Sequence, residues 1–210
     1  MTAIVTEAHR SGKRVAAHAV DDNSARIAVE AGVDSVEHGY GVSDEVLKMM
    51  AAKKIFLVPT DGTVDSFIHR TDLSPEVRQQ TEDIIRKYPI TFETGRLKRA
   101  MKWGVPIAAG SDYYYDGPSG MTRGQTAKWP LHAYAHAGMP LMDVIRTATI
   151  NAATLLGLQD RLGSIESGKY ADMIAVEGDP SKDIGAIDKV QFVMKGGEIV
   201  INKQPQADKR

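Results

Sequence analysis

Three polar side chains, His18, His38 and Asp112, are of types that bind metal ions, and each stands at or near the end of a short apolar stretch. The stretches have the pattern of buried strands of a parallel sheet and cover residues 14–19, 33–39 and 105–112. Two neutral imidazoles and a carboxylate are ligands that suit zinc and similar divalent ions. An ion held there would lower the pKa of a bound water and polarise a carbonyl group. The carboxylate could also take the proton of that water and pass it to a leaving group.

The two histidines lie 20 residues apart, at equivalent points of a strand–helix–strand unit. Residues 21–32 between the strands have a helical pattern, with an N-cap candidate at the start and Gly32 at the end. A right-handed crossover places consecutive strands side by side and parallel, so both imidazoles are expected at the same C-terminal edge. Each histidine taken alone could be a hydrogen-bonded core residue. Their repetition at equivalent strand ends favours a site.

Other polar residues near the strand ends are weaker candidates. His69 lies in the long polar segment 60–73, and Tyr113 and Tyr114 follow Asp112 directly. These three could contact a substrate, but a loop histidine commonly faces solvent and the tyrosines could equally anchor their loop. Glu37 precedes His38, and strand alternation places it on the other face, which indicates a structural role.

A second group of polar residues has a structural interpretation. His132 and His136 lie four apart on a predicted helix, a spacing that can bind metal. No HExxH pattern accompanies them, so helix surface or packing is favoured. Asp21, Asp22 and Asp61 also follow strand ends, and we interpret them as cap and turn residues.

Composition is that of an ordinary globular chain. The 210 residues are 42% hydrophobic and 25% charged, with a net charge of −1, which gives no electrostatic footprint for nucleic acid or an anionic membrane. There is no cysteine, so any metal must be held by histidine and carboxylate. No signal peptide and no apolar run of about 20 residues is evident. The default expectation is a soluble, cytoplasmic protein, although the compartment stays open.

The remaining pattern predicts strand–helix units followed by a β-rich segment. A further strand is predicted over 54–59, and helices over 2–12, 43–53, 74–103 with a break at Pro89, 129–137 and 141–156. From Leu162 short strands alternate with turns, at 173–176, 190–195 and 198–201, which indicates a small β appendage. About four parallel strand–helix units are present, whereas a closed (β/α)8 barrel needs eight.

Several segments together resemble a known family. They read V-A-A-H-A, S-V-E-H-G, I-A-A-G-S-D, A-T-I-N-A-A-T-L-L-G-L and L-G-S-I-E-S-G-K-Y-A-D-M-I-A-V. They are similar to the C-terminal half of the amidohydrolase superfamily, especially its imidazolonepropionase-like and Xaa-Pro dipeptidase (prolidase)-like members. The resemblance spans residues 2–201 and follows the family's order and spacing.

The resemblance implies both a fold and a ligand set. The fold would be α/β, the C-terminal half of a TIM barrel with a small β appendage. Residues 1–161 would form a partial barrel domain, 162–204 part of a small composite β domain, and 205–210 a tail. His18 and His38 match metal-ligating histidines, and Asp112 matches the aspartate that binds metal and serves as general base and acid. The cofactor would be one or two divalent ions, with zinc the first expectation.

The family pattern is incomplete in these residues. The His-x-His pair and the bridging carboxylated lysine or glutamate are absent. One hypothesis is a metal-dependent hydrolase of amide, dipeptide or cyclic amide C–N bonds, with a small-molecule substrate. The alternative is a catalytically inactive half-barrel that acts as a subunit or a self-associating scaffold. The hydrolase would need a partner that supplies the missing ligands, or a mononuclear site of three ligands. The half-barrel would associate with itself, as a homo-oligomer, or with a polypeptide that supplies the N-terminal half.

Overall fold

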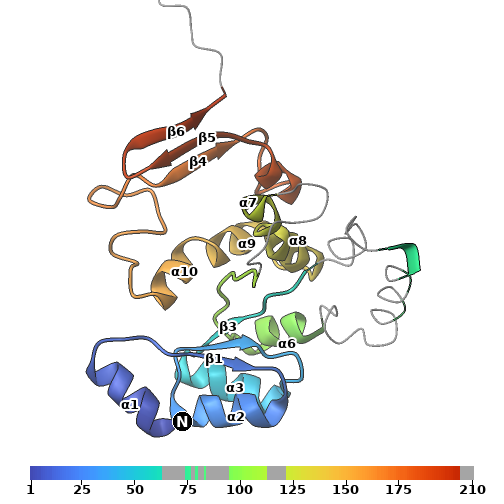
Figure 1. Cartoon of the computed structure of the whole chain (residues 1–210), viewed down its shortest axis with the longest axis vertical. Helices are drawn as coiled ribbons and strands as arrows, with labels where there is room; N and C mark the ends of the chain where they lie inside the picture. Colours follow the sequence, from blue (N-terminus) through green and yellow to red (C-terminus); the bar gives the residue numbers. More distant parts are fainter. Residues whose placement is uncertain (63–73, 77–78, 80–82, 84–94, 113–121, 204–210) are drawn as a thin grey trace, which may run out of the picture.

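The computed structural model describes residues 1–62, 74–76, 79, 83, 95–112 and 122–203 (Figure 1). Its first sheet is parallel and consists of β1 (Ala16–Ala19), β2 (Ser35–His38) and β3 (Phe56–Val58), in that order. Helices α2 (Asp22–Ala31) and α3 (Asp44–Lys53) connect consecutive strands, and α1 (Thr2–Arg10) precedes β1. The predicted strand–helix–strand unit around His18 and His38 is therefore confirmed.

Helix ends in this region follow from local side chains. The Asp21 carboxylate accepts a hydrogen bond from the Ser24 amide at the start of α2, and Gly32 ends this helix in the left-handed conformation with φ 83°. Ser43 caps α3 in the same way, and the Asp22 carboxylate accepts a hydrogen bond from the Ser43 amide at 2.8 Å. The cap interpretation of Asp21 is thus confirmed, whereas Asp22 joins the start of α2 to the segment before α3.

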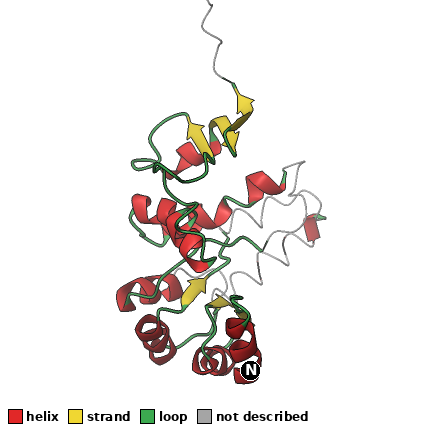
Figure 2. Cartoon of the chain, turned by 90° about the vertical axis from the view of Figure 1, so that its left-hand side faces the viewer, coloured by secondary structure: helices red, strands yellow, loops and turns green. Residues whose placement is uncertain are grey.

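Helices α2 and α3 cover one face of the parallel sheet. Ala17 and Ala19 of β1 are buried, whereas Ala16 and His18 on the opposite face are exposed. Figures 1 and 2 show α2 and α3 packed on one side of the sheet. The core between them is formed by small and branched apolar side chains, namely Ala25, Ala28, Val29, Val36, Val46, Leu47, Met50 and Leu57.

The segment predicted as a fourth strand, 105–112, forms an isolated parallel bridge between Ile107 and Leu57. Helix α6 (Gly95–Trp103) precedes it, within the predicted helical region 74–103, and Pro89 lies outside the described residues. Two backbone hydrogen bonds join the segment to β3, from the Leu57 amide to the Pro106 carbonyl at 2.9 Å and from the Ala108 amide to the Leu57 carbonyl at 3.1 Å. Across the described ranges the strands form two small sheets and no closed barrel.

Four short helices follow residue 122, where helices were predicted over 129–137 and 141–156. They are α7 (Arg123–Thr126), α8 (Trp129–His136), α9 (Leu141–Thr147) and α10 (Ile150–Leu155). The predicted helix 141–156 is divided where two threonine hydroxyls bond to backbone carbonyls one turn back, Thr147 to Val144 at 2.6 Å and Thr149 to Ile145 at 2.9 Å. Such bonds compete with the helical pattern and bend or interrupt it.

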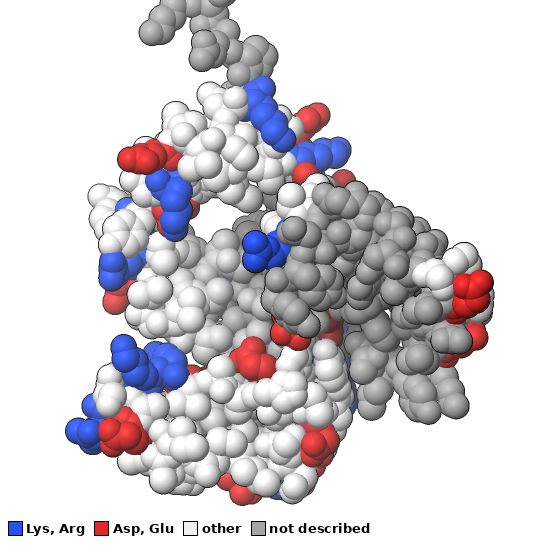
Figure 3. Space-filling model, viewed as in Figure 1, with Lys and Arg blue, Asp and Glu red and all other residues white. Residues whose placement is uncertain are grey.

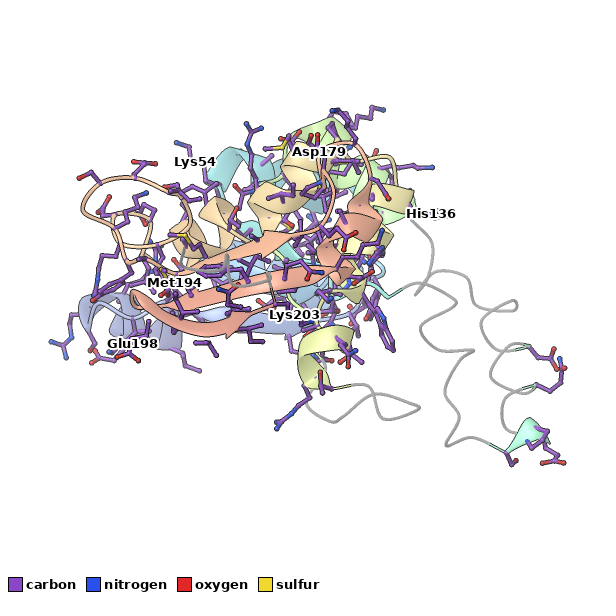
Figure 4. All side chains as sticks on the ribbon, turned by 90° about the horizontal axis from the view of Figure 1, so that it is seen from above. Lys54, His136, Asp179, Met194, Glu198 and Lys203 are labelled. Atoms are coloured by element: carbon purple, nitrogen blue, oxygen red, sulfur yellow. The ribbon has the colours of Figure 1, made fainter. Side chains whose placement is uncertain are left out.

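The C-terminal β segment forms a separate antiparallel sheet, as the sequence predicts. Its strands β4 (Met173–Val176), β5 (Val190–Lys195) and β6 (Glu198–Asn202) pair in sequence order. Seen from above, Met194 and Glu198 mark this sheet (Figure 4). Every residue of β6 is exposed.

A 3₁₀ turn, η3 (Ile184–Asp188), lies between β4 and β5 in the sequence and contacts α8. The Asp188 carboxylate lies 3.0 Å from the Lys128 ammonium and 2.9 Å from His132 Nε2. This contact agrees with the packing interpretation of His132. The described helices are all too short or too polar to cross a bilayer, and Figure 3 shows basic and acidic side chains interspersed on the visible face.

Asp34, just before β2, joins α1, β1 and β2 at the N-terminal end of the parallel sheet. Its carboxylate accepts from Arg14 at 2.6 Å and from the Val15 amide at 2.7 Å, and it lies 2.8 Å from His9 Nε2. Burial raises the pKa of Asp34, but these contacts outweigh it and hold the pKa below its usual range. A carboxylate with a depressed pKa stabilises the fold above its unfolded-state pKa of about 4, and loses this contribution as pH falls through its folded-state pKa.

We therefore expect the free energy of unfolding to fall more steeply below about pH 4 in the wild type than in Asp34→Asn, which cannot titrate there. Urea unfolding at a series of pH values measures this difference. Asp143→Asn, which alters the surface pair with Arg146, is the control and should retain the wild-type slope. Parallel pH profiles for wild type and Asp34→Asn would contradict the prediction.

Gly39, directly after β2, is required by both its conformation and its surroundings. Its φ is +60°, and a Cβ there would lie 3.0 Å from Leu57 Cδ1. Gly12 has a similar φ of +66° with no heavy atom within 4 Å of such a Cβ. A comparison of alanine substitutions at Gly12 and Gly39 therefore separates the cost of backbone strain from the cost of crowding.

We expect Gly12→Ala to lower the free energy of unfolding by about 1–2 kcal/mol through the left-handed backbone alone. Gly39→Ala should lose about a further 1 kcal/mol or more, because the added methyl crowds Leu57. Denaturant titrations of both variants test this. Equal losses would show that crowding at Gly39 relaxes without cost.

Candidate active site

The two histidines predicted as ligands meet at the C-terminal edge of the parallel sheet. The His18 and His38 rings lie 4.5 Å apart, centroid to centroid, in an edge-to-face arrangement. Strand register alone would not bring them together, because His18 pairs with Glu37 and His38 pairs with Ala19. His38 has a left-handed backbone, with φ 68°. This breaks the alternation at the end of β2, so its ring lies against the ring of His18.

The His38 imidazole is held on one side by β3. Its Nδ1 lies 2.7 Å from the Thr60 hydroxyl, which follows β3. Since Nδ1 has this partner, Nε2 is the nitrogen through which His38 can bind a ligand, and such second partners orient metal-binding histidines generally. Burial and the neighbouring His18 lower the pKa of His38, and Asp112 partly opposes them. A lowered pKa favours the neutral imidazole that metal binding requires.

Glu37 was expected on the opposite face, and that expectation is wrong. As the register partner of His18, Glu37 shares its face of the sheet. Burial raises the pKa of Glu37, and nearby Asp112 raises it further, against a hydrogen bond of 2.5 Å from Ser35. A raised pKa is common for carboxylates near functional sites.

Asp112 is exposed and has a left-handed backbone with φ 55°. Its charge acts on both Glu37 and His38, which places it near the same edge of the sheet. Within the described ranges, however, no three histidine or acidic side chains are arranged to hold a metal ion. The adjacent imidazoles suit two ligand positions, and the full ligand set is not assembled by the described residues. His69, Tyr113 and Tyr114 lie outside those residues.

Arg96 on α6 was not anticipated from the sequence. Its side chain is buried and donates to the His38 carbonyl and to the Asp61 carboxylate, and more weakly to the Pro59 carbonyl at 3.4 Å. Asp61 is therefore no simple turn residue, because it is the buried counter-ion of Arg96. Burial raises the pKa of Asp61, and the Arg96 guanidinium opposes this. No local pattern marks this pair, since its two members lie 35 positions apart.

Known proteins with similar sequences include hydrolases. The model of the amidohydrolase family matches residues 1–200. Ochratoxinase from Aspergillus niger is 31% identical over 202 residues, which are 93% of this chain and 40% of that protein. Imidazolonepropionase from Clostridium tetani is 27% identical over 208 residues, 95% of this chain and 43% of the relative. The chain thus spans less than half the length of these relatives.

Solved structures agree in fold. A Xaa-Pro dipeptidase with methionine bound in its active site is 33% identical, with a TM-score of 0.77 over 96% of this chain and 48% of the other. A second amidohydrolase structure is 28% identical, with a TM-score of 0.79 and the same 48% share. Paired histidines at neighbouring strand ends, a family match over nearly the whole chain and shared α/β structure agree: this chain belongs to the amidohydrolase family.

Proposed function

We propose that this chain takes part in metal-dependent hydrolysis of a C–N bond in an amide, a dipeptide or a cyclic amide. The contact between the His18 and His38 rings at the ends of neighbouring parallel strands carries the proposal. Two imidazoles at this separation can serve one metal site or two adjacent ones. The family match supports a hydrolase, and the relatives that include ochratoxinase and imidazolonepropionase make an inactive scaffold the less favoured alternative.

The proposed architecture is half of a TIM barrel. In it, β1, β2, β3 and the segment around Ile107 are four consecutive barrel strands, a reading supported by their parallel order and the Leu57–Ile107 bridge. Residues 1–161 would form this partial barrel, 162–204 part of a small β domain and 205–210 a tail. The site would lie at the C-terminal edge of the strands, where barrel enzymes place their chemistry.

In the proposed site, His18, His38 and Asp112 would hold a divalent ion, for which zinc is the first candidate. Such an ion, when bound, would supply acidification of water and polarisation of the scissile carbonyl. Asp112 would accept a proton from the attacking water and return it to the leaving nitrogen. His38 would be kept in one orientation by Thr60, and Glu37 would add negative charge beside Asp112.

The substrate class proposed is a small amide or peptide. Ochratoxinase and Xaa-Pro dipeptidase are among the similar proteins. His69, Tyr113 and Tyr114 are proposed as substrate contacts because they lie in the two segments that follow strand ends. The proposed partner is a second copy of the chain or a polypeptide that supplies further ligands.

Metal binding is tested by zinc titration in a calorimeter and by elemental analysis of the purified chain. We expect His18→Ala and His38→Ala each to weaken zinc binding by about 100-fold or more, because each removes a direct ligand and loss of an outer-shell partner alone already costs about 10–100-fold. His132→Ala is the matched control, since that histidine pairs with Asp188 away from the site. Equal losses in all three variants, or no zinc binding by the wild type, would overturn the ligand assignment.

The role of Asp112 is tested by Asp112→Asn with dipeptide and N-acyl amino acid substrates. Turnover should fall by about 100-fold or more, the usual contribution of a general acid–base group, while zinc content falls far less. Asp179→Asn, on an exposed turn before η3, should leave both unchanged. A loss of turnover that only matches the loss of zinc would show that Asp112 is a ligand and no proton carrier.

A further inference from the structure

The side chain of Arg96 connects the two strand ends that carry the proposed site. Its guanidinium donates to the carbonyl of His38, the last residue of β2, and to the carboxylate of Asp61, three residues after β3. The Pro59 carbonyl is a further, weaker acceptor at 3.4 Å. Only 4% of Arg96 is exposed, so these contacts are shielded from water.

Both strand ends have a backbone conformation that their residues rarely adopt. His38 and Thr60 have φ values of 68° and 56°, in the left-handed region that side chains with a Cβ disfavour. Such residues stay in this region only when surrounding contacts hold them there. Arg96 supplies such contacts, because it binds the His38 carbonyl and the residues on either side of Thr60.

Thr60 and Tyr40 connect Arg96 to the His38 imidazole through further contacts. The Thr60 hydroxyl lies 2.7 Å from His38 Nδ1 and 3.3 Å from the Tyr40 hydroxyl. The Tyr40 ring lies under the Arg96 guanidinium, at 4.9 Å, and beside the His38 ring, at 5.5 Å. Arg96 therefore constrains the imidazole through its backbone, through Thr60 and through Tyr40.

A direct role in substrate binding is excluded for Arg96 by its burial and its counter-ion. Asp61, itself 6% exposed, balances the guanidinium charge. The planar fork of the guanidinium can reach separate acceptors at fixed angles, which a lysine ammonium cannot reproduce. Arg96 therefore contributes hydrogen bonds in fixed directions to the ends of β2 and β3.

We propose that Arg96 is a positioning residue, which joins the ends of β2 and β3 and thereby fixes the His38 imidazole against His18. This inference rests on the proposed function, because a fixed His38 imidazole matters if that imidazole binds a metal ion. It extends the assignment to a residue that would touch neither metal nor substrate.

The test uses Arg96→Lys and the double variant Arg96→Met/Asp61→Asn. The double variant removes both buried charges, so it avoids an unpaired buried carboxylate, and such replacements are often tolerated by the fold. The matched control is Arg99→Met/Asp44→Asn. Arg99 lies on the same helix and also binds a carboxylate and a carbonyl, those of Asp44 and Val42, both at 2.9 Å.

The first readout is ¹⁵N NMR of the imidazoles in metal-free protein at pH 8, with the His38 signals identified by their loss in His38→Ala. We expect the wild type to show one tautomer, and the Arg96 variants to move toward a mixture of the two. The second readout is zinc affinity, which should fall about 10–100-fold in the double variant and less in Arg96→Lys, as for other groups that orient a ligand. The control should match the wild type in both.

Folded Arg96 variants with unchanged His38 signals would overturn the inference, whatever their stability. If the double variant does not fold, Arg96→Lys is judged by the same criterion. If the wild type binds no zinc, the proposed function fails, but the imidazole signals still decide the role of Arg96. A change in those signals that appears equally in the Arg99 control would also refute it.

Discussion

The left-handed turn of the backbone at His38 is the constraint on which the candidate site depends. In a regular strand the His38 side chain would point away from His18, because its register partner is Ala19. The turn reverses this and places the two rings 4.5 Å apart. Gly39 then continues the left-handed path, and its amide donates to the Ala19 carbonyl at 2.8 Å, so β1 and β2 stay joined beyond their ends.

Charge at this edge of the sheet is arranged in two layers. The charge of exposed Asp112 acts on the His38 imidazole and on Glu37. Below them, Arg96 and Asp61 neutralise each other. A buried ion pair contributes little net stability, because desolvation offsets its attraction, and its value lies in specific geometry. The Arg96 charge still acts on the His38 imidazole and helps to lower its pKa.

Much of the fold could be predicted from residue types and their periodicity. Short apolar strands around His18 and His38, the capped helices between them and the antiparallel strands after residue 162 each depend on local signals, and each was confirmed. The division of helix 141–156 could not be predicted with the same ease, since Thr147 and Thr149 are compatible with either outcome until their hydroxyl contacts are known. The segment 105–112 has a strand-like composition but forms a single bridge, because pairing depends on neighbours that composition does not reveal.

The site was only partly predictable for a related reason. His18 and His38 stand at equivalent points of the sequence pattern, but the strand register pairs His18 with Glu37. An alignment of the two strands that pairs His18 with Glu37 would have placed Glu37 on the same face of the sheet as His18. Arg96 and Asp61 gave no such signal, because their pairing depends on how α6 packs against the sheet.

The order of pairing has a consequence for how the chain folds. In each described sheet, every strand pairs with the next one in sequence, and β1, β2 and β3 lie within residues 16–58. Contacts between neighbouring elements of the sequence close shorter loops than contacts between distant segments, and shorter loops cost less entropy to close. Each described sheet therefore pairs its strands within one segment of the chain. The contacts of Asp188 with Lys128 and His132 join segments far apart in the sequence, so they close longer loops and cost more loop-closure entropy.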